Sequence, residues 1–78
     1  MHSIYVKLDT IDKVKTLVAI LSPTEGDFDL VSDRYVVDAK SIMGIFSLDI
    51  SKPLRLDMHN PTSTEKVLPL LEPFIVTV

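Results

Sequence analysis

The sequence contains no cysteine, no tryptophan and only two glycines among its 78 residues. Without cysteine there is no disulfide framework, no thiolate zinc site and no thiol nucleophile. Two isolated glycines leave no glycine-rich loop that would cradle a phosphate. No apolar run approaches the roughly 20 residues that a membrane-spanning helix needs. A disulfide-stabilised protein, a zinc-thiolate protein, a thiol-dependent enzyme, a protein with a glycine-rich phosphate loop and a membrane-spanning protein are therefore not expected.

An excess of positive charge is also missing. Eight basic side chains face 11 acidic ones, and the formal net charge is -3. Nucleic acids and anionic membranes are bound through clustered positive charge, so neither is an expected partner. The first residues lack the basic-then-apolar layout of a signal peptide, which makes the cytoplasm the expected location. With 46% apolar residues, residues 1–78 are expected to form a single folded domain.

Apolar and polar residues alternate in four segments, at residues 4–8, 28–31, 34–38 and 54–58. A period of two predicts strands with one buried face. The second and third segments are close enough in sequence for a tight hairpin at Ser32-Asp33.

Helical spacing of apolar residues appears between these strands and after them, at residues 14–21, 40–51 and 62–74. Asp9 or Thr10 is expected to cap the first helix, and Ser41 the second, because their side-chain oxygens accept hydrogen bonds from free first-turn N–H groups.

The C-terminal region combines a helix with an apolar tail. Thr62 with Glu65 predicts a capping box, while Pro69 predicts a helix that is short, kinked or broken. Residues 74–78 are expected to add a strand, to cover the sheet, or to pair with a second copy of the chain. The order β-α-β-β-α-β-α predicts an α+β open-faced sandwich, in which a four-stranded, mostly antiparallel sheet carries its helices on one face.

The run Lys40-Ser41-Ile42-Met43-Gly44, followed by Ser47-Leu48, resembles the regulatory-serine segment of HPr, the phosphocarrier protein family of the bacterial sugar phosphotransferase system. The resemblance is strongest over residues 36–58, and the predicted element order is similar to that of the family. It implies that Ser41 is phosphorylated by an ATP-dependent kinase. It also implies a surface that contacts protein partners, namely phosphotransferase-system enzymes, the serine kinase or a regulator, through Lys40, Ile42, Met43, Ile45 and Phe46.

The sequence departs from this family at the phosphoryl-accepting histidine. That histidine lies in a Gly-(Ile/Leu)-His-Ala-Arg-Pro loop after the first strand, whereas residues 8–15 here contain no histidine, arginine, glycine or proline. Lys13 stands about where the histidine would be. A protonated amine has no lone pair with which to attack a phosphoryl group. Histidine-based phosphocarrier chemistry is therefore not predicted.

Three functions remain open. The first is a non-enzymatic regulatory or binding module that acts through Ser41 and its neighbours. The second is a phosphocarrier that uses His2 or His59, although neither stands at a predicted helix start. The third is a structural or oligomerising domain, in which the apolar helical residues are simply core. Exposure of Met43 and of part of Phe46 would favour binding. Two isolated histidines make no metal-ligand spacing, and no cofactor is expected.

Overall fold

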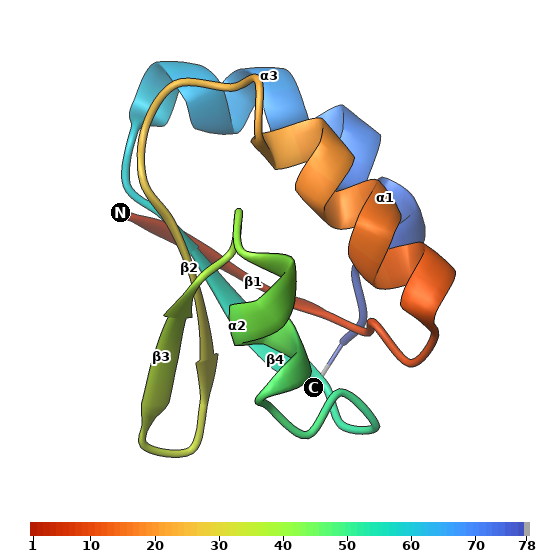
Figure 1. Ribbon diagram of the computed structural model, residues 1–78. Helices are drawn as coiled ribbons and strands as arrows, with labels where there is room; N and C mark the ends of the chain where they lie inside the picture. Colours follow the sequence, from red (N-terminus) through yellow and green to blue (C-terminus); the bar gives the residue numbers. More distant parts are fainter. Residues whose placement is uncertain (78) are drawn as a thin grey trace.

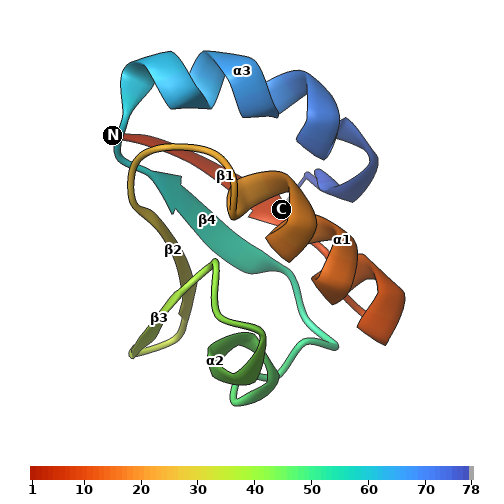
Figure 2. The same ribbon diagram turned by 45° about the horizontal axis from the view of Figure 1, so that its top comes forward.

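The computed structural model of the protein describes residues 1–77. Four strands are present, β1 (His2–Val6), β2 (Phe28–Ser32), β3 (Tyr35–Asp38) and β4 (Leu54–Met58). Three α-helices and one 3₁₀ turn accompany them, α1 (Ile11–Leu21), α2 (Ile42–Phe46), α3 (Pro61–Leu71) and η1 (Glu72–Phe74). The strands form one sheet with the helices over one of its faces (Figures 1 and 2), which confirms the predicted α+β open-faced sandwich.

The sheet has the strand order β1-β4-β2-β3, and every neighbouring pair is antiparallel. Leu56 in β4 lies opposite Ile4 in β1 and Leu30 in β2, so one aliphatic row crosses the sheet on its inner face. The inner face packs against the buried stripe of α1, which consists of Val14, Leu17, Val18 and Leu21. Burial of these side chains is the main stabilising contribution to a domain of this size.

Two local details of the N-terminal half differ from the prediction or refine it. Thr10 caps α1, since its hydroxyl accepts a hydrogen bond from the Lys13 N–H at 3.2 Å. The hairpin turn consists of Asp33 and Arg34 rather than Ser32-Asp33, because β2 continues through Ser32, which pairs with Tyr35. Asp33 adopts φ 51°, a left-handed conformation that aspartate tolerates better than most residues.

The start of α3 also differs. Asn60, rather than Thr62, is its N-cap, and the Asn60 side chain accepts a hydrogen bond from the Ser63 N–H at 3.1 Å. Pro61 occupies the first turn, where the missing N–H has no helical partner to lose. The predicted capping box is therefore wrong. The helix is not broken at Pro69 either, because it continues to Leu71 before it tightens into η1.

The C-terminal tail lies beside the edge of β1 that does not pair with β4. The Lys7 N–H donates to the Phe74 carbonyl, and the Val76 N–H donates to the Tyr5 carbonyl, each at 2.9 Å. Val6 and Ile75 form an antiparallel bridge between these two bonds. The tail thus adds to the sheet of its own chain, one of the expected arrangements; Val78, at its end, lies outside the described residues.

Candidate functional site

Ser41 is the N-cap of α2, as its position in the sequence predicts. Its backbone is extended, and its Oγ accepts a hydrogen bond from the Gly44 N–H at 3.1 Å. The Ser41 carbonyl accepts the first α-helical bond, from the Ile45 N–H. The hydroxyl is half-buried, and it lies at the positive end of a short helix.

The apolar residues that follow Ser41 divide between surface and core. Met43 is 82% exposed, and Ile42 and Phe46 are 37% and 40% exposed. We call Ser41, Ile42, Met43 and Phe46 the Ser41 face.

Ile45 does not belong to the Ser41 face. Its side chain is 0% exposed and is part of the hydrophobic core. The expectation that Ile45 contacts a partner is therefore wrong. The reason is helical geometry: α2 spans only five residues, and about one position in each turn must point at the sheet to hold the helix there.

Lys40 precedes the Ser41 face, but its ammonium is directed elsewhere. Its Nζ donates to the Thr24 carbonyl at 2.7 Å and lies 5.5 Å from the centroid of the Phe28 ring. The stem is half-buried. Lys40 therefore ties the start of α2 to the connection between α1 and β2.

The loop between β1 and α1 carries charges but no imidazole. Lys13 lies in the first turn of α1, and its Nζ forms an ion pair with Asp9 at 2.8 Å. This hydrogen bond lowers the pKa of the Asp9 carboxyl below its ordinary value. Asp12 lies in the first turn of α1, where its carboxylate interacts favourably with the helix dipole. The α1 N-terminus thus carries the Asp9–Lys13 ion pair and the Asp12 carboxylate, and no imidazole that could accept a phosphoryl group.

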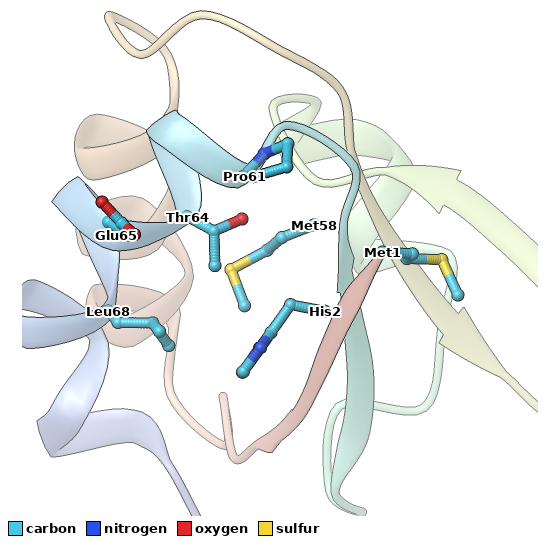
Figure 3. Close-up of a pocket in the computed structure, with 7 residues that line it drawn as sticks. All are labelled: Met1, His2, Met58, Pro61, Thr64, Glu65 and Leu68. Carbon is cyan, nitrogen blue, oxygen red and sulfur yellow. The ribbon is translucent and has the colours of Figure 1, made fainter.

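The two histidines come to the same end of the sheet, on opposite faces. His2 in β1 lies opposite Met58 and points into a cavity of about 300 Å³ beside α3 (Figure 3). The ring of His59 lies on the other side, where its Nε2 is 2.9 Å from the Asp29 carboxylate. His59 directly precedes the Asn60 cap of α3, so it stands nearer a helix start than the sequence predicts.

One buried ionic group is not among the residues that the sequence analysis singled out. Asp57 lies on the outer face of the sheet, where it accepts hydrogen bonds from the Ser3 hydroxyl at 2.7 Å and the Arg55 Nε at 2.9 Å. Burial raises the pKa of Asp57, but these two bonds and the Arg55 charge outweigh it and leave the pKa lowered. The Ser3 contact depends on the β1–β4 register, whereas the Arg55–Asp57 pair follows from a two-residue spacing that places both side chains on one face of β4.

Residues 1–77 contain no group of three or more histidine and carboxylate side chains that could hold a metal ion. Over the same range, no helix is both long enough and apolar enough to cross a membrane.

The element order, the β1-β4-β2-β3 sheet and a short helix capped by serine define a class of small open-faced α+β sandwiches. Among solved structures, the chain is similar to the crystal structure of HPr-C-His from Thermoanaerobacter tengcongensis, with a TM-score of 0.73. The alignment covers 92% of each chain at 22% identity, so the fold is HPr-like. No family model and no curated protein matches the sequence.

Proposed function

We propose that this HPr-like protein is a regulatory binding module of the sugar phosphotransferase system that acts through the Ser41 face rather than as a histidine phosphocarrier. The observation that carries the proposal is the exposure of Met43, at 82%, immediately after the capping serine. Exposed methionine adapts to varied partner surfaces. Its position beside a residue that can receive a phosphate would make that contact switchable.

Phosphorylation of Ser41 would change the chemistry of the Ser41 face. A phosphate adds about -1.5 to -2 charges at neutral pH. Its oxygens can keep the capping interaction that Ser41 already makes with the Gly44 N–H, so the helix tolerates the modification. A partner that buries Met43 and Ile42 would then have to desolvate the new charge, and binding would weaken.

The two alternatives have less support. A phosphocarrier needs a free imidazole nitrogen as its nucleophile, and the α1 N-terminus carries an Asp9–Lys13 ion pair instead. At His59 the neighbouring Asp29 carboxylate would repel an incoming phosphoryl group. A purely structural role for α2 needs only the buried Ile45, and it does not account for the exposure of Met43.

The proposed partners are proteins: a phosphotransferase-system enzyme, the serine kinase, or a regulator. On this proposal the protein is not an enzyme, it needs no cofactor, and its cytoplasmic location stays a prediction.

The first test is intact-mass analysis after incubation with ATP and a serine kinase that modifies HPr. We expect the mass to rise by one phosphate, mapped to Ser41, and we expect Ser41→Ala to stay unmodified. An HPr in the same tube serves as the positive control. If that HPr is phosphorylated and this protein is not, the regulatory role of Ser41 is overturned.

A second test addresses the apolar part of the Ser41 face. Binding to the enzyme that phosphorylates HPr is measured for Met43→Glu and for Leu70→Glu, a matched variant on α3 at an apolar residue that is 56% exposed. We expect Met43→Glu to weaken binding at least about tenfold, equivalent to 1.4 kcal/mol, and Leu70→Glu to leave it unchanged. Equal effects of the two variants would place the contact elsewhere.

A further inference from the structure

The sheet has two outer strands, and only one of them is covered. The tail lies along the outer side of β1, held by the Lys7–Phe74 and Val76–Tyr5 hydrogen bonds. At the other edge of the sheet, no strand within residues 1–77 pairs with the outer edge of β3 (Figures 1 and 2). An uncovered edge strand presents N–H and C=O groups to which another strand can pair.

The hydrogen-bond pattern shows which groups of β3 face outward. The Ala39 N–H donates to the Phe28 carbonyl at 2.8 Å, so Ala39 is directed at β2. The direction of the backbone N–H and C=O groups alternates along an antiparallel strand, so those of Val37 and Tyr35 also point at β2. Val36 and Asp38 direct their N–H and C=O groups away from β2. The Asp38 carbonyl already accepts a hydrogen bond from the Ser41 N–H at 3.0 Å, so the free part of the edge is centred on Val36. The Val36 side chain, on the outer face, is 62% exposed.

We propose that the protein forms a homodimer in which the β3 strands of two copies pair antiparallel about a two-fold axis at Val36. A two-fold axis requires a strand that is complementary to itself. With Val36 opposite Val36 of the second copy, each Arg34, which lies in the hairpin turn directly before β3, comes beside Asp38 at the end of β3 of the second copy. The two opposite charges thus meet twice, on either side of an apolar centre.

The remaining side chains fit the same register. Tyr35, which is exposed, lies opposite Val37 of the second copy on the inner face, and aromatic with β-branched residues is a favourable cross-strand pair. On the outer face, Val36 already neighbours Val31 of β2, so the dimer would join two valine pairs into one strip. The central residues 35–37 contain neither a charged residue nor a proline, which commonly keep edge strands from pairing.

The dimer is expected to be weak and concentration-dependent. A strand of four residues buries less than the roughly 1,200 Å² that stable protein interfaces reach. The proposal is independent of the Ser41 function, because the pairing uses the backbone of β3 and not the Ser41 face.

The test is sedimentation analysis of the full chain over about a hundredfold range of concentration. We expect the average mass to rise toward that of a dimer, and Val36→Pro to abolish the rise. Proline removes an N–H that makes no bond within the chain, and its φ suits an edge strand. Val36→Thr, which keeps this N–H and the branched side chain, is the matched control and should still dimerise.

Charge reversal tests the register. Arg34→Glu should weaken dimerisation at least about tenfold, because each of the two Arg34–Asp38 contacts would then bring two carboxylates together. The double variant Arg34→Glu with Asp38→Arg restores opposite charges and should restore dimerisation. Circular dichroism monitors folding, because Asp38 also accepts a hydrogen bond from the Lys40 N–H. A double variant that is folded and remains as weak as the single one contradicts this register.

The absence of natural cysteine allows a direct geometric test. Opposed residues in a hydrogen-bonded antiparallel pair have Cα atoms about 5.5 Å apart, within the range that a disulfide spans. Val36→Cys should form a disulfide-linked dimer on mild oxidation, much faster than Tyr5→Cys on β1, which is also exposed. Equal cross-linking rates, a wild-type chain that is monomeric at every concentration, or pairing only with strands of other proteins would overturn the proposal.

Discussion

The hydroxyl of Ser41 has two roles that can be separated experimentally. In the unmodified protein its oxygen caps α2 through the Gly44 N–H. In the proposed function the same oxygen receives a phosphate. Any variant that removes the oxygen alters both, so stability must be measured beside binding or modification.

Ser41→Ala is expected to lower the free energy of unfolding by about 1 kcal/mol, the usual effect of removing a cap. Ser41→Asp should retain wild-type stability, because aspartate is a good N-cap and its charge suits the helix dipole. Urea unfolding of both variants provides the measurement. If Ser41→Asp were as unstable as Ser41→Ala, the capping role assigned to this residue would be wrong.

Asp57 makes stability depend on pH. Its pKa is lowered in the folded protein, because the Ser3 and Arg55 bonds outweigh the effect of burial. A lowered folded-state pKa means that the contribution is complete above the unfolded value of about 3.9 and is lost as the pH falls through the folded value.

We therefore expect Asp57→Asn to be less stable than wild type near neutral pH, by about 1–3 kcal/mol, because charge-assisted hydrogen bonds are lost. The difference should shrink as the pH falls below about 4, where the wild-type carboxyl also loses its charge. Urea unfolding at several pH values measures it. Asp9 and Asp49 also have lowered pKa values, but both proteins retain these residues, so their contribution to the pH dependence cancels in the comparison. A difference that does not vary with pH would contradict this role.

At the scale of the element, periodicity predicts well wherever one stretch of chain contains the cause. The buried stripe of α1, the Ser41 cap and the whole of β4 follow from spacing within their own segments. The N-cap of α3 is also local, because Asn60 directly precedes Pro61 at the first helical position, but the Thr62–Glu65 spacing competes with it and predicts the wrong cap. What no local pattern contains is the close approach of Gly26 to Asn60. Gly26 has φ 102°, and a Cβ there would lie 2.6 Å from that of Asn60.

The two prolines of α3 occupy positions with opposite consequences. Pro69 is exposed and lies inside the helix, so it removes a ladder bond that alanine would restore. Pro69→Ala should raise the free energy of unfolding by about 1–3 kcal/mol. Pro61→Ala, the matched control in the first turn, should give no gain, since that N–H has no helical acceptor. Chemical unfolding compares them, and an equal gain from both would refute the distinction.

At the scale of the whole molecule, the pairing and register of the strands determine contacts that local sequence patterns do not predict. The Ser3–Asp57 hydrogen bond and the contact of the tail with β1 depend on which strands are neighbours, and no local pattern contains that information. Ile45 shows the same limit within the candidate site. The motif places it with its exposed neighbours, whereas only the packing of α2 on the sheet places it in the core.

The tail contributes to stability through one buried side chain. Phe74 is part of the core, whereas Ile75 next to it is substantially exposed. Phe74→Ala should lower the free energy of unfolding by about 3–5 kcal/mol, a large share of the total for a small domain. Ile75→Ala should lower it by no more than about 1 kcal/mol. Thermal or urea unfolding distinguishes the two, and similar losses would contradict the packing of Phe74.

Truncation after Phe74 separates the two edges of the sheet as sites of association. It keeps the buried phenyl ring but removes the Val76–Tyr5 hydrogen bond, so it uncovers part of β1. If the tail held two copies together, truncation would lower the mass measured by sedimentation. Because the tail instead covers β1 within its own chain, and β3 is the open edge, we expect the truncated protein to associate at least as strongly as the full chain. Combining the truncation with Val36→Pro should then leave only the association that uncovered β1 supports.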